Sequence, residues 1–292
     1  MRILVTGGCG YIGSRLIPFL LADGHSVTVF DAMYFGDGFL PDNPKLTLIK
    51  GDIRDAQAVK DASLGQDVVI WLASVSNNDM YKVNYDVVHE INTTLHPYSQ
   101  FIYASSVAVL DPTSDYAKDK LTCEKSLDGT GAIIVRAASV CGYSSRQRFD
   151  LTLNMMTHDA YRKGVITVFG GEQNRSHVHI DDLCDFYRLV VKKGVSGETY
   201  TVWNIGLKIK HAAQDIQNIF EAHKRPISIR YEPRADNRDW PTLNGDSMRS
   251  IGAENKRAVW DGVRDLIHKF DAGYWKDSLE NSIYQNTLPS IE

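Results

Sequence analysis

A glycine-rich turn near the amino terminus constrains this chain more than any other feature of its sequence. The apolar run 3–5 leads into glycines at positions 7, 8, 10 and 13, and an amphipathic stretch over 12–22 follows. Glycines let the backbone approach a pyrophosphate closely, and a helix start offers it unpaired N–H groups. A second apolar run ends in Asp31, 18 residues after Gly13, near the spacing of a ribose-binding carboxylate. This context favours a dinucleotide-binding strand, turn and helix over a structural glycine turn beside a solvent-facing Asp31.

Apolar runs and helical patterns alternate through the first half of the chain. Nearly continuous apolar runs are typical of parallel strands buried on both faces. These runs span 3–5, 27–30, 46–49, 67–72, 101–103 and 132–135, and helical patterns span 12–22, 55–63, 82–92 and 115–127. The alternation predicts an α/β fold with a Rossmann-type doubly wound parallel sheet, covered by helices on both faces. After about residue 145 the alternation breaks, which indicates a smaller α/β substrate-binding lobe on the C-terminal side.

The predicted organisation is therefore interleaved. We expect a dinucleotide-binding Rossmann domain over 1–145, to which 177–206 returns, and a substrate-binding lobe made of 146–176 and 207–292. A chain of 292 residues is long enough to bury a large core. The formal net charge of −4 and the pI of about 6.1 give no reason to expect a nucleic acid or a membrane as partner.

The cysteines and the amino terminus indicate the compartment. The four cysteines are far apart and show no metal-ligand spacing, and the short first apolar run is followed by glycines rather than by a secretion signal. No apolar run reaches the length of a membrane-spanning helix. We therefore expect a cytoplasmic protein.

A tyrosine and a lysine with helical spacing carry the second chemical signal. Tyr116 and Lys120 are four residues apart, so they share one face of the predicted helix over 115–127. A nearby ammonium stabilises a phenolate, and such a pair can take a proton from a hydroxyl or return one to an alkoxide. Upstream, the strand over 101–103 ends near Ser105 and Ser106, where parallel α/β folds bind ligands. The alternative for these serines is turn capping.

Together these features resemble the extended short-chain dehydrogenase/reductase (SDR) family, in particular its sugar-nucleotide epimerase and dehydratase branch. The resemblance covers most of the chain and depends on the glycine turn, Asp31, the Tyr116–Lys120 pair and further segments in the family's order. These segments are 51–55, 71–74, 101–106, 134–142, 149–154, 169–175 and 178–182.

The resemblance implies a set of functional residues and NAD as the cofactor. The implied catalytic residues are Ser106, Tyr116 and Lys120. The implied cofactor-binding residues are Gly7, Gly10, Tyr11, Ile12, Gly13, Asp31, Asp52, Ile53, Leu72, Ala73, Ser74, Tyr116 and Lys120. The implied substrate-binding residues are Ser106, Ser139, Asn154, Arg175 and Arg238. Asp31 favours NAD because its carboxylate would repel the 2′-phosphate of NADP.

Some of these residues have other readings. The alternative for Asn154 is a helix N-cap or a buried polar residue, and that for Arg238 is a surface ion pair. Arg15 follows the glycines, and we interpret it as an exposed helix residue rather than a ligand of NADP. His177 and His179 with Asp181 do not indicate a metal site, because they fit a strand that enters a helix capped by Asp181.

Departures from the family's pattern bear on the reaction. Family dehydratases carry an Asp-Glu pair directly after the catalytic serine, whereas this chain has Val107 and Ala108, so we do not expect 4,6-dehydration. Ser139 stands where many 4-epimerases carry a substrate-binding Asn. The segments 92–106 and 106–116 are shorter than is usual in the family. The shortening widens the access side of the site.

The resemblance supports one principal function and two alternatives. The principal one is an NAD-dependent epimerase, similar to UDP-hexose 4-epimerases, that oxidises and re-reduces C4 of a nucleotide-sugar through a keto intermediate. A UDP-sugar is the simplest substrate, and a homodimer is the expected assembly. One alternative is an NAD(P)H-dependent reductase of a 4-keto sugar nucleotide. The other is a dinucleotide-binding sensor or RNA-binding relative without turnover, which the acidic charge and the intact Ser106, Tyr116 and Lys120 argue against.

Overall fold

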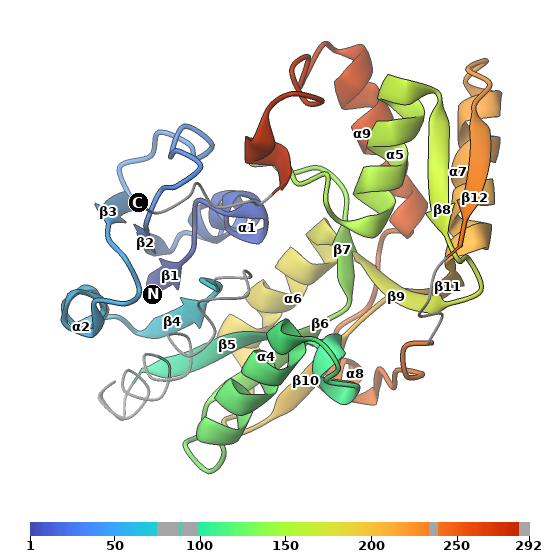
Figure 1. Ribbon diagram of the computed structural model, residues 1–292. Helices are drawn as coiled ribbons and strands as arrows, with labels where there is room; N and C mark the ends of the chain where they lie inside the picture. Colours follow the sequence, from blue (N-terminus) through green and yellow to red (C-terminus); the bar gives the residue numbers. More distant parts are fainter. Residues whose placement is uncertain (75–87, 89–98, 234–238, 286–292) are drawn as a thin grey trace.

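The computed structural model describes residues 1–74, 88, 99–233 and 239–285. It joins a large parallel sheet with helices on both faces to a second lobe, which lies at the upper right of Figure 1. The strands are β1 (Arg2–Thr6), β2 (Ser26–Asp31), β3 (Leu46–Lys50), β4 (Val68–Trp71), β5 (Gln100–Ser106), β6 (Ile133–Ala137), β7 (Ser139–Cys141), β8 (Val165–Phe169), β9 (Asn174–His179), β10 (Thr199–Val202), β11 (Ile205–Lys208) and β12 (Ser228–Glu232). The α-helices are α1 (Tyr11–Ala22), α2 (Ala56–Ser63), α4 (Asp115–Ser126), α5 (Thr152–Lys163), α6 (Ile180–Lys193), α7 (Ile209–Ala222), α8 (Asp246–Ser250) and α9 (Val259–Asp271), and the 3₁₀ turns are η1 (Val107–Leu110) and η2 (Ser282–Gln285).

The large sheet has seven parallel strands in the order β10-β6-β5-β4-β1-β2-β3. All six predicted strands are present in it, and the predicted Rossmann-type fold is confirmed. The strand order reverses direction between β1 and β4. Strands β2 and β3 lie on one side of β1, whereas β4, β5 and β6 lie on its other side. In such sheets a crevice forms at the carboxyl ends of the strands where the order reverses, and ligands bind there.

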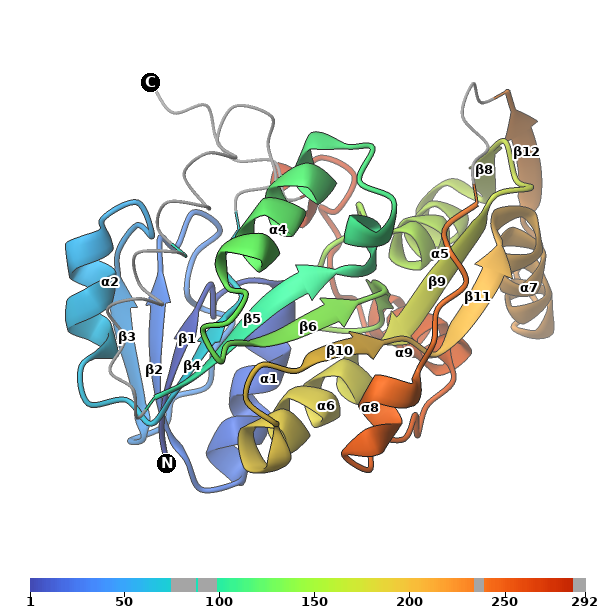
Figure 2. The same cartoon turned by 90° about the horizontal axis from the view of Figure 1, so that it is seen from below.

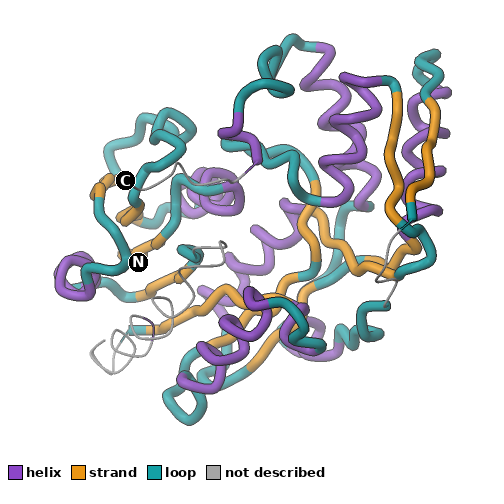
Figure 3. The backbone as a smooth tube through the Cα atoms, in the orientation of Figure 1, coloured by secondary structure: helices purple, strands orange, loops and turns teal. Residues whose placement is uncertain are grey.

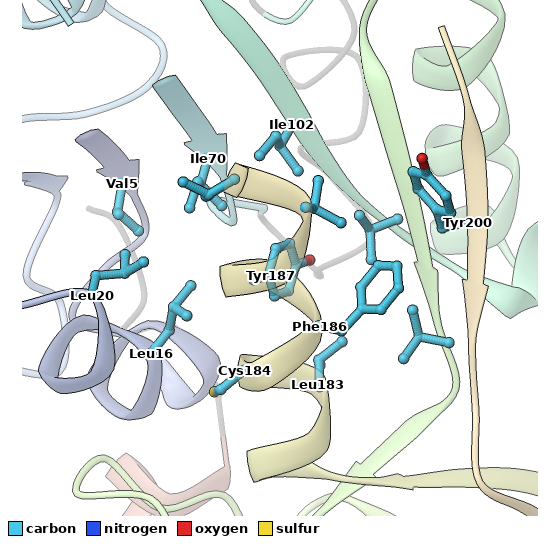
Figure 4. Close-up of a cluster of buried hydrophobic side chains, with 14 of the residues drawn as sticks. Val5, Leu16, Leu20, Ile70, Ile102, Leu183, Cys184, Phe186, Tyr187 and Tyr200 are labelled. Atoms are coloured by element: carbon cyan, nitrogen blue, oxygen red, sulfur yellow. The ribbon is translucent and has the colours of Figure 1, made fainter. Parts of the chain in front are cut away.

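Two separate apolar cores lie on the two faces of this sheet, between the strands and the helices that cover them. Helices α1 and α6 cover one face, where Leu16 and Leu20 of α1 and Leu183 and Tyr187 of α6 are buried with side chains of the strands (Figure 4). The opposite face packs against α2 and α4, with Val59 and Cys123 buried there. Figure 2 shows α4 and α6 on opposite sides of the strands. Coverage on both faces explains why these strands appear in the sequence as continuous apolar runs.

The chain returns to the large sheet after it has begun the second lobe. Strand β10 pairs in parallel with β6, and α6 packs beside α1 (Figure 2). Strands β7, β8 and β9, which precede α6, and strands β11 and β12, which follow β10, build the second lobe: β7, β9 and β11 form a small mixed sheet, and β8 pairs with β12. Helices α5, α7 and α9 lie beside these strands (Figure 3). Their apolar side chains form a third core against the strands.

The predicted helix over 82–92 lies outside the described residues except for Val88, which is helical and buried. The sequence also predicts that the chain has no membrane-spanning helix and no metal site. Within 1–74, 88, 99–233 and 239–285, no helix is long and apolar enough to cross a bilayer, and no group of three or more His, Cys, Asp or Glu side chains is arranged to hold a metal.

Candidate active site

A cleft of about 260 Å³ opens at the carboxyl ends of the central strands. It lies where the strand order reverses, between the glycine turn after β1 and the start of α4. Every residue predicted to bind the cofactor lines it. These residues are Gly7, Gly10, Tyr11, Ile12, Gly13, Asp31, Asp52, Ile53, Leu72, Ala73, Ser74, Tyr116 and Lys120.

The glycine turn leaves no room for side chains at two of its positions. Gly7 has a φ of 71°, and a Cβ there would lie 2.7 Å from the Ala73 nitrogen. A Cβ at Gly13 would lie 2.5 Å from the carbonyl oxygen of Gly8. Because these neighbours are backbone atoms, neither contact can be relieved by a side-chain rotation. The floor of the cleft is therefore bare backbone at the start of α1, which suits a pyrophosphate.

Asp31 stands at the end of β2 and is fixed by the backbone around it. Its carboxylate accepts hydrogen bonds from the N–H of Cys9 at 3.0 Å and from the N–H of Met33 at 2.7 Å. Burial raises the pKa of Asp31, and the two N–H bonds oppose this. Each carboxylate oxygen has more than one acceptor position, so Asp31 still has capacity to accept from ribose hydroxyls.

A polar group lies beside Asp31, where β3 ends. The Asp52 carboxylate accepts from Arg54 at 2.5 Å and from the Tyr34 hydroxyl at 3.1 Å. The bond from Arg54 lowers the pKa of Asp52. Tyr34 and Phe35, in the loop after β2, also line the cleft. No sequence motif marks this loop as part of the site, because its position over the cleft depends on packing.

Helix α4 carries the predicted Tyr116–Lys120 pair to the edge of the cleft. The Ser114 hydroxyl caps this helix by accepting from the N–H of Ala117 at 3.2 Å. Lys120 is 3% exposed, and its ammonium donates to the carbonyl oxygen of Ala104 at 2.8 Å. The Lys120 ammonium lies 6.0 Å from the centroid of the Tyr116 ring. The two side chains therefore face the cleft together, with Lys120 the more deeply buried.

An ion pair between the buried Glu124 and the half-buried Arg136 holds α4 against the strands one turn further on. Glu124 accepts from the Ser105 hydroxyl at 2.5 Å and from the Arg136 guanidinium at 2.5 and 3.0 Å. These bonds join α4 to β5 and β6 at the level of the cleft. Glu124 and Arg136 were not predicted as site residues, because nothing in their spacing shows that they meet in the fold.

The predicted substrate residues lie along a path that leads away from the cleft. Ser106 ends β5 and pairs with Ala137 of β6, Ser139 pairs with His177 of β9, and Arg175 lies two residues before His177. The Ser106 hydroxyl accepts from the N–H of Ala108 at 3.2 Å and so caps η1. The Arg175 guanidinium lies 5.0 Å from the centroid of the Trp240 ring. Arg238 lies outside the described residues.

Asn154 lies in a different environment from the one predicted. It is 0% exposed, within the first turn of α5. Its amide donates to the Tyr11 hydroxyl at 3.1 Å and to the Arg148 carbonyl at 3.0 Å, and accepts from the N–H of Gly142 at 3.0 Å. Both amide hydrogens are thus engaged with protein oxygens. This geometry supports the buried polar alternative and does not support a contact between Asn154 and a diphosphate.

Two further interpretations need correction. Arg15 is half-buried and not simply an exposed helix residue: it forms a forked ion pair with Asp181 of α6, at 2.6 and 2.9 Å. Asp181 does not cap α6, because His179 holds that position and accepts from the N–H of Asp181 at 3.1 Å. Arg15 therefore ties α1 to α6 on the side of α1 that packs against that helix.

We expect acid to destabilise the protein through His177. This side chain is 0% exposed, and burial lowers its pKa from 6.5 to about 4. The unfolded chain binds a proton at this imidazole below about pH 6.5, which the folded chain resists. The stabilisation is therefore complete above pH 6.5 and is lost as the pH falls toward 4, by at most about 1.4 kcal/mol per pH unit.

Urea unfolding of wild type and of His177→Leu, between about pH 7 and pH 4.5, measures this contribution. Leucine does not titrate, so the free energy of unfolding should fall less steeply with acid in the variant. The lowered pKa of His179 acts in the same direction and is present in both proteins. Equal slopes in the two proteins would contradict the assignment to His177.

The fold and the cleft define an α/β protein of the dinucleotide-binding class with a Tyr–Lys pair beside the nucleotide site. Comparison with known proteins specifies this class further. The model of the NAD dependent epimerase/dehydratase family matches residues 3–206, and the chain belongs to this family. NAD is therefore its cofactor, and the bare glycine floor and Asp31 fit that molecule.

Three relatives are distant but extend over nearly the whole chain. A UDP-glucose 4-epimerase from Lactobacillus helveticus is 26% identical, covering 94% of this chain and 96% of its own. A structure of dTDP-glucose 4,6-dehydratase from Bacillus anthracis in complex with NAD has a TM-score of 0.84 at 21% identity, covering 96% of this chain and 100% of the other. A structure of UDP-glucose 4-epimerase with UDP-glucose from Thermotoga maritima has a TM-score of 0.78 at 22% identity, covering 94% and 99%. At these identities the solved structures establish the fold.

Proposed function

We propose that this protein is an NAD-dependent sugar-nucleotide epimerase that inverts a hexose hydroxyl carbon, C4, of a UDP-sugar. One observation carries the proposal: α4 brings Tyr116 and Lys120 to the edge of the cleft that the glycine turn and Asp31 also line. A hydroxyl placed at this edge would lie beside both a proton acceptor and the cofactor.

The chain's own residues supply proton transfer and positioning. Tyr116 would take the proton from the sugar hydroxyl as hydride leaves the same carbon. After the keto sugar has turned over and hydride has returned to the other face of that carbon, Tyr116 would give the proton back to the oxygen. Lys120 would stabilise the phenolate, and its bond to Ala104 keeps the ammonium in place below the tyrosine ring. Ser106 would contact the same sugar hydroxyl. Bound NAD supplies a hydride acceptor and donor, so no external oxidant is consumed.

The choice of epimerisation over dehydration depends on η1. A dehydratase needs an acid and a base beside the sugar to remove water. The positions that follow Ser106 are Val107 and Ala108, which cannot transfer protons. This supports epimerisation even though dehydratases are also among the structural relatives.

We assign the nucleotide part of the substrate to the small sheet of the second lobe. Ser139 and Arg175 lie on its adjacent strands β7 and β9, where a guanidinium can bind a diphosphate through two hydrogen bonds. Arg238 remains a proposed second contact. Homodimer formation and a cytoplasmic location are part of the proposal and follow from the family resemblance and from the charge and cysteine pattern of the sequence.

The reaction itself is tested by incubating the purified protein with a panel of sugar nucleotides that includes UDP-glucose and UDP-galactose. The product should have the same mass as the substrate and a different stereochemistry, and added NADH should not be consumed. Mass spectrometry combined with separation of the isomers distinguishes the outcomes. A product lighter by one water would contradict the proposal in favour of dehydration, and steady oxidation of NADPH would support a 4-keto sugar reductase instead.

A further inference from the structure

The segment between β7 and α5 lies directly against the glycine turn. The Tyr11 hydroxyl donates to the carbonyl oxygen of Gly142 at 2.7 Å. The Ser144 hydroxyl lies 2.7 Å from the Ser14 hydroxyl and also 2.7 Å from the carbonyl oxygen of Tyr11. With the N–H of Arg146, which donates to the Ser14 hydroxyl at 3.2 Å, these bonds hold residues 142–146 beside the first turn of α1, where the bare backbone of the cleft is placed for a pyrophosphate.

Arg148 of this segment lines the cleft and is half of a local ion pair. Its guanidinium donates to the Asp150 carboxylate at 2.9 and 2.5 Å. The pair is accessible, with 25% of the Arg148 side chain and 30% of the Asp150 side chain exposed. A partly exposed pair of this kind contributes little to stability, so Arg148 can change partners at small cost.

The other cationic side chains around the cleft have partners of their own. Lys120 lines the cleft beside Tyr116 and donates to Ala104, and Arg15 is tied to Asp181. Arg146 is 1% exposed and packs with its guanidinium 4.0 Å from the centroid of the Phe35 ring. Among the described residues that line the cleft, Arg148 therefore carries the only guanidinium.

The charge balance of the segment favours an anion. Arg146 and Arg148 repel each other, and this repulsion adds to burial in lowering the pKa of Arg146 to about 10. Asp150 offsets one of the two positive charges. A pyrophosphate at the glycine turn would bring two negative charges to the same place, where the start of α1 also favours them.

We propose that Arg148 binds the pyrophosphate of NAD and exchanges its Asp150 partner for phosphate oxygens when the nucleotide enters. The guanidinium forms two parallel hydrogen bonds to a carboxylate and can form the same pattern with a phosphate. Asp150 then acts as a competing anion that sets how tightly the cofactor is held. This inference depends on NAD binding and not on the proposed reaction.

The test measures nucleotide affinity by calorimetry, after any co-purified nucleotide has been removed. Arg148→Ala should weaken the binding of NAD and of ADP-ribose, which retains the pyrophosphate, by about tenfold to a hundredfold. Arg148→Lys should recover part of the loss, because an ammonium lacks the forked geometry. Asp150→Asn removes the competitor and should tighten both ligands by about two- to fivefold.

Matched measurements separate this role from a structural one. Arg249→Ala removes the guanidinium of another exposed pair, with Asp246 at 3.1 Å, and should leave NAD affinity unchanged. The binding of UDP should be unaffected by Arg148→Ala. If Asp150→Asn weakens NAD as Arg148→Ala does, the pair is structural and the proposal is wrong. A loss confined to UDP, or unchanged affinity for NAD and ADP-ribose in Arg148→Ala, would also overturn it. Each of these results is independent of whether the protein epimerises a sugar.

Discussion

Replacing Tyr116 by phenylalanine should lower turnover at least about 100-fold while NAD remains bound, which is the usual scale for loss of an acid–base group. The variant keeps the aromatic ring at the start of α4 and removes only the hydroxyl. Lys120 is held by its bond to Ala104 and not by the tyrosine hydroxyl, so the surrounding geometry should not change. Initial rates with the active sugar nucleotide, together with NAD affinity, measure the two effects separately.

The matched control for this variant is Tyr274→Phe. Tyr274 is 43% exposed and belongs to an aromatic cluster around Trp275, outside the cleft. Its loss of a hydroxyl should leave turnover unchanged. Near-normal turnover in Tyr116→Phe would remove Tyr116 from the proposed mechanism. A comparable fall in both variants would indicate a general sensitivity to tyrosine substitution instead.

Replacing Gly13 by alanine should reduce NAD affinity by about 100-fold, the order expected when a tightly packed position is forced to accept an extra carbon. The new Cβ would lie 2.5 Å from the Gly8 oxygen and 2.6 Å from the Gly8 Cα. Relieving these contacts requires the glycine turn to move away from α1, which would displace the backbone N–H groups that we propose face the cofactor. Calorimetric titration with NAD, beside circular dichroism to verify the fold, measures the effect.

Gly38→Ala provides the control for this second variant. Gly38 lies in the loop after β2, and a Cβ there would meet no atom within 4 Å. The Gly38→Ala variant should bind NAD with the affinity of the wild-type protein. Retained affinity in Gly13→Ala would show that the turn tolerates movement and that the close contacts do not determine cofactor binding.

The strands of the large sheet could be predicted from sequence because burial on both faces requires continuous apolar runs. The runs over 27–30 and 101–103 correspond to β2 and β5, although β5 is longer and includes Ser105 and Ser106. The extension was missed because these serines interrupt the apolar pattern. The structure shows why Ser105 is tolerated there: its hydroxyl is satisfied by Glu124.

Some residues of the candidate site could likewise be predicted from the sequence, and others could not. Gly7, Gly13 and Asp31, which line the cleft, could be proposed from the sequence because the motif that contains them is local to one strand, turn and helix. A local motif predicts a substrate contact for Asn154. The motif cannot show that the Asn154 amide meets Tyr11, 143 residues earlier in the chain. Arg148 has no motif, and only the contacts of its segment with α1 bring it to the cleft.

The sequence by itself therefore determined the Rossmann-type sheet, the family and the position of the glycine turn, since these depend on periodicity and on neighbours close in the chain. The tertiary structure alone decided which charges meet: Arg15 with Asp181, Glu124 with Arg136, and Arg148 with the cleft. A side chain of Arg or Asp is compatible with many partners, and the energy of each pairing depends on distance and burial. Those quantities exist only once the helices and strands have packed.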